Sequence, residues 1–228
     1  MGEPSVKVRL GFAPEAYADI RGASLVHADP PWSYRQATGL QGAAAASYGT
    51  ITMPEIVEHL DAAYDSAGAN CYLVCWCTMP MLADWFRASE GLRWRYLSAG
   101  AWIKTTGIGV GYHWRGDAEA LLLYAKGAPK PAHKSLRNAA MSPRSKHSQK
   151  PVKWLRQIVA AFRQPGDGVV LDVYSGLSPL AHACRAEGAP YVGIECDPKR
   201  RDAALESLGI GEGQIFATPA QPAPVGGA

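Results

Sequence analysis

Two consecutive prolines behind a short apolar run constrain this chain most. The run Ser24-Leu25-Val26-His27-Ala28 is typical of a buried strand in a parallel sheet, and Asp29-Pro30-Pro31-Trp32 follows it directly. A proline lacks the backbone N–H and has a fixed φ, so two of them cannot continue the hydrogen bonding of a strand. We therefore expect a stiff loop at the carboxyl edge of the sheet, which is where open α/β sheets bind ligands.

This loop presents a carboxylate, rigid backbone carbonyls and an indole ring together. Asp29 and the Pro30 carbonyl can accept the two N–H bonds of an exocyclic amino group, while Trp32 stacks on the flat heterocycle that carries it. The alternative interpretation is an ordinary strand-ending turn, with Asp29 as a cap and Trp32 as part of the core. The motifs later in the chain favour the first interpretation.

The rest of the chain has the pattern of one α/β domain. Its 228 residues, 47% of them hydrophobic, suffice for a single core, and no apolar run is long enough to span a membrane. We expect helices over 52–64, 79–89, 152–159 and 179–187, and strands over 70–76, 97–104, 118–126, 169–172 and 191–194. Residues 1–22 read as a lead-in without strong periodicity, and 218–228 as a disordered tail.

The location and the metal content follow from simple observations. The first ten residues lack the apolar core of a signal peptide, which predicts a cytoplasmic protein. Three of the five cysteines lie in one apolar strand-like run without the spacing of a zinc site. We therefore expect free thiols and no metal.

Charge is distributed unevenly along the sequence. The net charge is only +3, but residues 120–166 contain no Asp or Glu and carry ten Lys or Arg. Like charges without compensating acids repel one another unless a polyanion is near, which favours contact with nucleic acid phosphates. The alternative is a solvated loop that keeps the protein soluble.

Two loops have the composition of substrate-binding segments. Residues 105–116 combine several glycines with Tyr112, Trp114 and Arg115, and residues 29–50 form a connection that is long for an α/β unit. Aromatic rings can stack on a base, and arginine can contact phosphate. The alternative for the first loop is a flexible hairpin.

A third segment has the pattern of a nucleotide-cofactor unit. The expected strand 169–172 leads into a bend at Gly176 and then a helix, and Glu195 lies about twenty residues further on. Such an acid can accept the ribose hydroxyls of a cofactor. Ser178 is expected to cap the helix, with Pro179 at its first position. The alternative is a βαβ unit without a ligand.

Taken together, these motifs resemble those of a known family. Asp29-Pro30-Pro31-Trp32 is similar to the catalytic motif of nucleobase amino-methyltransferases, in the form found in the messenger-RNA adenosine methyltransferases and their bacterial and phage DNA relatives. His147-Ser148-Gln149-Lys150-Pro151 resembles the His-x-x-Lys-Pro segment of the permuted, β-type DNA methyltransferases. Residues 169–176 and 191–195 resemble their cofactor-binding strands. The sequence departs from the family at 174–178, where Tyr-Ser-Gly-Leu-Ser replaces Phe-x-Gly-x-Gly.

The resemblance implies a single-domain Rossmann-like fold over residues 1–213, with permuted motif order, a mostly parallel sheet with helices on both faces and substrate-binding loops over 105–150. It implies an S-adenosylmethionine-dependent enzyme that methylates the N6 amino group of adenine in DNA. RNA adenosine, the N4 amino group of DNA cytosine, and an inactive nucleic-acid-binding subunit are the alternatives, and a homodimer is left open.

The resemblance also assigns roles to residues. The implied catalytic residues are Asp29, Pro30, Pro31 and Trp32. The implied cofactor-binding residues are Asp29, His147, Lys150, Asp172, Tyr174, Ser175, Gly176, Ser178 and Glu195. The expected substrate-binding residues are Tyr34, Arg35, Tyr112, Trp114, Arg115, Lys134, Arg137, Arg144 and Lys146. An Asp29 carboxylate buried in a salt link, or turned away from Gly176 and Glu195, would contradict this mechanism.

Overall fold

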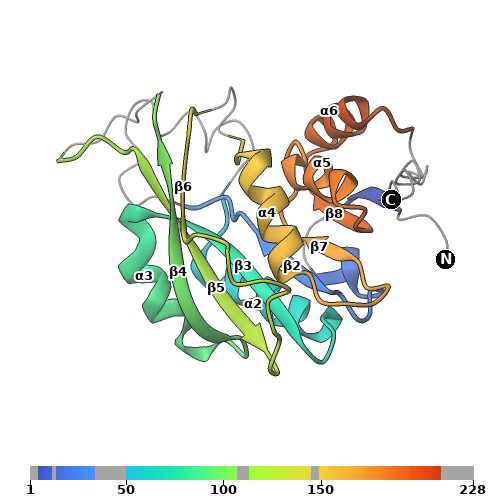
Figure 1. Ribbon diagram of the computed structural model, residues 1–228, viewed down its shortest axis with the longest axis horizontal. Coiled ribbons are helices and arrows are strands. Elements are labelled where there is room, and N and C mark those ends of the chain that lie inside the picture. The colour runs from blue at the N-terminus through green and yellow to red at the C-terminus, as the bar shows by residue number, and fades with distance from the viewer. Residues whose placement is uncertain (1–4, 12–13, 34–49, 107–112, 145–148, 212–228) are drawn as a thin grey trace, which may run out of the picture.

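The computed structural model describes residues 5–11, 14–33, 50–106, 113–144 and 149–211. Within them, one eight-stranded sheet runs in the order β1-β8-β7-β2-β3-β5-β4-β6 (Figure 1). The strands are β1 (Val6–Leu10), β2 (Leu25–Ala28), β3 (Cys71–Thr78), β4 (Arg95–Lys104), β5 (Ala118–Lys126), β6 (Ala139–Ser142), β7 (Val170–Asp172) and β8 (Tyr191–Glu195). Strand β5 is antiparallel to both of its neighbours, and the other pairs are parallel. The expected α/β class is confirmed.

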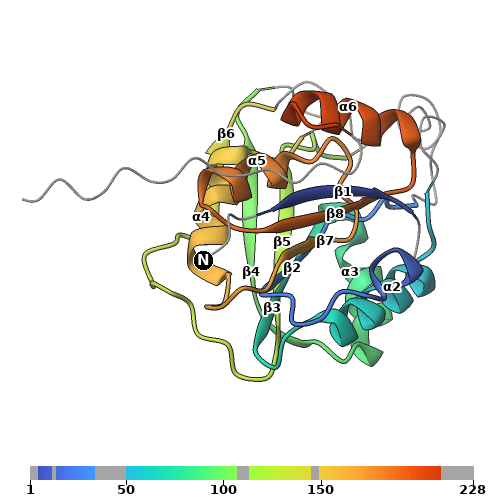
Figure 2. The ribbon, with the colours of Figure 1, turned by 90° about the vertical axis from the view of Figure 1, so that its right-hand side faces the viewer.

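Helices cover both faces of this sheet. Helices α2 (Met53–Ser66) and α3 (Leu82–Ala88) lie on one face, and α4 (Val152–Phe162) and α5 (Pro179–Ala186) on the other, with α6 (Pro198–Leu208) near β1 (Figure 2). Each face has its own hydrophobic cluster. Ile56 and Leu60 of α2 belong to one, and Leu155 of α4 and Leu180 of α5 to the other. No described helix is long and apolar enough to cross a membrane.

The strand that precedes the two prolines ends where the sequence predicts. All four residues of β2 are buried, and the strand stops at Ala28. The Trp32 backbone N–H then donates to the Pro30 carbonyl at 2.9 Å, which forms a tight three-residue turn. The Ile51 N–H donates to the Pro31 carbonyl at 3.2 Å. The two ends of the long loop therefore meet beside the prolines.

Helix α2 begins with the signals that its sequence contains. Thr52 is the N-cap, and its hydroxyl accepts from the Glu55 N–H while the Glu55 carboxylate accepts from the Thr52 N–H at 2.7 Å. This reciprocal arrangement satisfies two amides that the helix itself leaves unpaired. A proline in the first turn has no N–H to satisfy, so the helix starts immediately behind the loop.

Two edge strands were not predicted. The expected lead-in contains β1, which pairs with β8 from Val6↔Tyr191 to Leu10↔Glu195. Its alternation is short: Val6 and Val8 contact the α4–α5 core, while Lys7 and Arg9 face the other way. The segment expected to be basic loop contains β6, which pairs with β4 and leaves Met141 72% exposed. Both strands depend on partners distant in sequence, so their own patterns are weak.

Smaller differences concern element ends and the tail. The helix expected over 79–89 is a 3₁₀ turn (Met79–Met81), then α3, then a second 3₁₀ turn (Ser89–Gly91). The expected disordered tail, 218–228, lies outside the described residues. The cysteines are free, as expected, and Cys71, Cys75 and Cys77 are buried in β3.

Candidate active site

Asp29 lies at the carboxyl end of β2, between the ends of β3 and β7. One carboxylate oxygen, Oδ2, is 2.7 Å from the Lys150 ammonium. The Asp29 side chain is 34% exposed, whereas that of Lys150 is 7% exposed. A salt link is therefore present at Asp29, but it is not a buried one. The carboxylate keeps an open side at the edge where the sequence places the ligand.

Lys150 is shared between two carboxylates. Its ammonium lies 3.0 Å from Oε2 of Glu119 on β5, whose Oε1 lies 2.5 Å from the ammonium of Lys104 at the end of β4. Two lysines and two acids thus alternate, and their formal charges cancel. The antiparallel pairing of β4 with β5 brings Lys104 and Glu119 together, and the turn into α4 adds Lys150. Lys104 was not among the predicted site residues.

The charges in this cluster shift one another. Burial alone would remove the charge of Lys150, but the carboxylates of Asp29 and Glu119 hold its pKa above the ordinary value. Burial alone would also raise the pKa of Glu119, yet Lys150 and Lys104 hold it below the ordinary value. Although a third of its surface is exposed, Asp29 is surrounded by protein on its other sides. This desolvation raises its pKa, and Lys150 opposes the rise.

The carbonyls of the two prolines are partly committed. Each accepts one backbone N–H, as described above. A carbonyl oxygen has two lone pairs, so Pro30 retains one for a ligand. Asp29 is the less committed of the two predicted acceptors.

Trp32 does not lie in the open as a stacking platform. Its side chain is buried, and its ring meets that of Trp85 on α3 edge to face, with centroids 5.4 Å apart. The prediction that Trp32 stacks on the substrate ring is therefore wrong, and the alternative interpretation as core applies. Packing of the Trp32 ring against α3 removes apolar surface from water, and this burial lowers the free energy relative to an exposed ring.

Asp172 is engaged beneath the site and does not face a ligand. Its Oδ1 lies 2.8 Å from Nδ1 of His27 on β2, and its Oδ2 accepts from the Tyr191 hydroxyl at 3.0 Å. The side chain is buried. Both oxygens are thus used inside the sheet, and the predicted direct contact of Asp172 with a cofactor is wrong. Neither His27 nor Tyr191 was predicted, although a histidine in an apolar strand was a usable signal.

The bend after β7 has a left-handed backbone at two positions. Gly176 has φ +54°, and Ser178 has φ +54° and ψ +49°. This region favours glycine, so Ser178 occupies a conformation that a side chain adopts at a cost. Ser178 is the N-cap residue of α5 and Pro179 its first residue, as predicted, but the Ser178 side chain makes no capping hydrogen bond. A β-region N-cap would be needed for that bond.

Tyr174, Ser175 and Glu195 surround this bend. The Tyr174 hydroxyl is 2.9 Å from Nδ1 of His59 on α2. The Ser175 hydroxyl is buried and has no hydrogen-bond partner among the described residues. Glu195, at the carboxyl end of β8, accepts the Asp197 N–H through Oε1 at 2.9 Å. A hydroxyl without a partner, a left-handed bend and a carboxylate whose Oε2 has no hydrogen bond within the described part of the chain fit a nucleoside cofactor.

The other predicted residues fall into two groups. The described ones are exposed at the surface: Trp114, Arg115, Lys134, Arg137 and Arg144. Trp114 is the most open large hydrophobic side chain among the described residues, at 84% exposed. The rest lie outside the described residues: Tyr34, Arg35, Tyr112, Lys146 and His147. No group of three or more described His, Cys, Asp or Glu residues is arranged to hold a metal ion.

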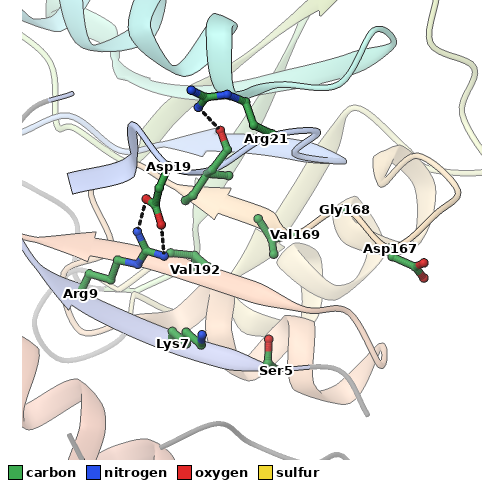
Figure 3. A pocket seen from close by; sticks show the side chains of 10 residues that line it. Ser5, Lys7, Arg9, Asp19, Arg21, Asp167, Gly168, Val169 and Val192 are labelled. Atoms are coloured by element: carbon green, nitrogen blue, oxygen red, sulfur yellow. Dashed lines mark hydrogen bonds and ion pairs between the residues drawn. The ribbon is translucent and has the colours of Figure 1, made fainter. Parts of the chain in front are cut away.

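One cavity is lined by β1, by the segment before β2 and by the segment before β7. It has a volume of about 250 Å³ and is lined by Lys7, Arg9, Asp19, Arg21 and Asp167, among others (Figure 3). Arg9 pairs with Asp19 across it. Asp167 precedes β7 and Arg21 precedes β2, so the cavity borders the amino ends of these two strands, whereas Arg9 lies toward the carboxyl end of β1. It is separate from the site at Asp29.

Comparison with known proteins places these features in context. A family model described as DNA methylase matches residues 24–206. A search of curated proteins finds no match. Three solved structures are similar over most of the chain. The M1.HpyAVI complex with S-adenosylmethionine has a TM-score of 0.65 at 15% identity, covering 89% of this chain and 100% of that one.

The other two structures are of similar closeness. TTHA0409 from Thermus thermophilus, complexed with S-adenosyl-L-methionine, has a TM-score of 0.69 at 18% identity, covering 92% of this chain and 99% of that one. The PvuII DNA methyltransferase, described as cytosine-N4-specific, has a TM-score of 0.70 at 11% identity, covering 90% of this chain and 88% of that one. At such identities the likeness shows a shared fold.

Proposed function

The chain belongs to the DNA methylase family of N6 and N4 amino-methyltransferases, and on that premise we propose that it methylates the N6 amino group of adenine in DNA. The methyl donor is S-adenosylmethionine. The observation that carries the proposal is the Asp29 carboxylate at the end of β2, with one oxygen held by Lys150 and an open side toward solvent.

The donor carries its methyl group on a sulfonium. The neutral thioether that remains after transfer is a good leaving group, so no protein nucleophile is needed. The difficulty lies in the acceptor, because the lone pair of the amino nitrogen is delocalised into the ring. Asp29 and the free lone pair of the Pro30 carbonyl accept its N–H bonds and draw the nitrogen toward pyramidal geometry. Acceptors fixed in advance also stabilise the positive charge that develops there.

Asp29 also suits the proton that must leave. As the N–C bond forms and the S–C bond breaks, the nitrogen becomes cationic and must lose one proton. Desolvation raises the pKa of Asp29, which makes it a better proton acceptor than an ordinary aspartate. Lys150 opposes that rise, because its positive charge favours the ionised form of the carboxylate.

The cofactor is assigned to the neighbouring bend. Residues 174–178 and Glu195 border the same edge of the sheet, since β2, β7 and β8 are adjacent parallel strands. We assign the ribose hydroxyls to Glu195 and the close backbone approach to Gly176. His147 is kept as a proposed cofactor contact. Lys150 is assigned to hold the Asp29 carboxylate, which it contacts at 2.7 Å.

DNA is the proposed polymer, and we assign its contacts to exposed aromatic and basic residues in the segments before and after β5. Trp114 and Arg115 precede β5, and Lys134, Arg137 and Arg144 follow it. Exposed cations release counterions when they meet phosphates, and an exposed indole can stack on a base. A base in a duplex must leave the stack before its amino group can reach Asp29.

Cytosine is the second candidate, for a specific reason. The N4 amino group of cytosine presents the same pair of N–H bonds, and the PvuII enzyme that shares this fold is described as cytosine-N4-specific. Because Trp32 is in the core, it does not select a purine ring by stacking. The choice between the two bases thus depends on contacts beyond Asp29.

The test is methyl transfer followed by nucleoside analysis. Purified protein and deuterium-labelled S-adenosylmethionine are incubated with either unmethylated genomic DNA or total RNA. The nucleic acid is then digested, and its nucleosides are separated and identified by mass spectrometry. We expect labelled N6-methyldeoxyadenosine. Labelled N4-methyldeoxycytidine would show that the target base is cytosine and not adenine. Label found only in RNA would overturn the proposal that DNA is the substrate. Cofactor binding without any transfer would indicate an inactive subunit.

A further inference from the structure

A histidine lies in the middle of the sheet, on the strand that leads directly to Asp29. His27 is 2% exposed, on a strand whose other residues are apolar. Both of its ring nitrogens have partners. Nδ1 lies 2.8 Å from Oδ1 of Asp172 on β7, and Nε2 lies 2.8 Å from the indole nitrogen of Trp76 on β3. His27 therefore connects three adjacent strands through their side chains.

The donors and acceptors in this set are fixed by chemistry. An indole nitrogen only donates, so Nε2 of His27 accepts the Trp76 N–H. Nδ1 must then carry the proton of the neutral ring, and it donates to Asp172. The second oxygen of Asp172 accepts from Tyr191. Each buried polar atom in the set has a partner, and such satisfied networks hold one arrangement.

The Trp76 ring also meets the charged cluster. The Lys150 ammonium lies 5.0 Å from the ring centroid, within the range of a cation–π contact. Trp102 and Trp154 meet the same ring edge to face, with centroids 6.2 and 5.6 Å away. Packing thus confines the indole, and the bond to His27 selects one orientation of it.

We propose that His27 is a positioning residue for methyl transfer: by holding the Trp76 indole it fixes the Lys150 ammonium and, through it, the Asp29 carboxylate. This inference rests on the proposed function for its catalytic meaning. The same hydrogen bonds link β2, which carries Asp29, to β7, which leads into the cofactor bend. His27 touches neither substrate nor cofactor in this role and acts through Trp76.

Trp76→Phe is the central variant. It keeps an aromatic ring but removes the indole N–H that donates to Nε2 of His27, so His27 no longer holds the ring. The Lys150 ammonium also loses the stronger cation–π partner. Trp154→Phe is the matched control, because Trp154 packs on the same cluster and its indole nitrogen has no hydrogen-bond partner among the described residues. Both variants remove the same atoms from neighbouring buried positions.

The readout is the ionisation of Asp29. The groups that face it are Lys150, Glu119 of β5, His27 of β2 and Cys75 of β3. Lys150 holds the pKa of Asp29 down, so a displaced ammonium should move the Asp29 titration to higher pH. Carbon-13 NMR of aspartate carboxyls follows that titration directly, with Asp29→Asn as the assignment control. The acid limb of the kcat/KM profile follows it in turnover.

We expect Trp76→Phe to raise the midpoint of the Asp29 titration and the acid limb of the kcat/KM profile by about half a pH unit each. It should also lower kcat about tenfold or more. The Kd of S-adenosylmethionine should stay within about twofold. Trp154→Phe should move neither. His27→Gln, which keeps one donor and one acceptor, should retain more activity than His27→Leu.

Equal titrations and equal kcat in Trp76→Phe and Trp154→Phe would overturn the proposal. If the wild type transfers no methyl group, the proposed function fails, and the NMR titration still decides the positioning role. If the wild type is active and the titration does not move, only the positioning role fails.

Discussion

The Lys150 ammonium and the Asp29 carboxylate, 2.7 Å apart, join the segment before α4 to the loop after β2. This pair brings together two motifs that are distant in the sequence, the Asp-Pro-Pro-Trp loop and the Lys-Pro segment. Because Lys150 is also held by Glu119, the carboxylate of Asp29 is fixed through a chain of charges that ends at Lys104. Each member of that chain has a separate, measurable effect.

Asp29→Asn should abolish methyl transfer while leaving cofactor binding nearly intact. An amide has one accepting oxygen where a carboxylate has two, carries no negative charge for Lys150 and cannot take up the proton. Lys150 keeps Glu119 as its partner, so the fold should persist. We expect a loss of at least about a thousandfold in kcat. Radiolabel transfer and calorimetry with S-adenosylmethionine measure the two quantities.

Asp19→Asn is the control for that variant, since Asp19 is an exposed acid that pairs with Arg9 of β1, whereas Asp29 pairs with Lys150. It should transfer methyl groups at the wild-type rate. An Asp29→Asn protein that turns over normally would remove Asp29 from the mechanism.

Lys150→Met should move the acid limb of the activity profile upward. The reaction needs the ionised form of Asp29, so activity falls as pH falls through the pKa of this carboxyl. Lys150 holds that pKa down, and its removal takes away the largest influence that opposes desolvation. We expect the acid limb of kcat/KM to rise by about one pH unit. Lys153→Met, at an exposed lysine in the first turn of α4, three residues after Lys150, serves as the control. An unchanged limb would separate Lys150 from Asp29.

Ser178→Gly should stabilise the protein. Ser178 has φ +54°, where a side chain is strained and glycine is not. Relief of this strain should raise the free energy of unfolding by about 1 kcal/mol. Gly176→Ala is the converse test, because Gly176 has φ +54° and an added Cβ would meet only Arg200 Nη1, at 3.8 Å. It should destabilise by a similar amount without a clash. Urea unfolding measures the change in the free energy of unfolding for both variants. A change of the same sign in the two would contradict backbone strain at Ser178.

Trp114→Ala should weaken DNA binding and little else. The indole is 84% exposed, so its removal costs the fold almost nothing. Stacking on a base is worth about 1–3 kcal/mol, which predicts a loss of about tenfold in affinity. Fluorescence anisotropy with a labelled duplex measures it. Phe86→Ala, on α3, removes another exposed aromatic ring and should leave DNA affinity unchanged. Equal losses in both variants would make the effect non-specific.

The chain by itself determined the features that depend on neighbours in sequence. Pro30 and Pro31 end β2 because they lack the N–H that the sheet requires, and Thr52 and Glu55 start α2 because they satisfy its first amides. The strands around Asp29 and Glu195 are apolar runs whose burial needs no special partner. These local rules placed Asp29 at the end of its strand and the bend at 174–178 at the end of β7, and the pairing of β2 with β7 brings the two together.

Only the tertiary structure decided how side chains from distant segments are paired. Trp32 looked available for stacking but packs on Trp85, and Asp172 looked available for a ligand but is taken by His27 and Tyr191. Strands β1 and β6 exist because β8 and β4 offer free edges. The physical reason is the same in each case. A contact between residues far apart in the chain has its energy set by the assembled sheet, and the local pattern of either residue does not contain it.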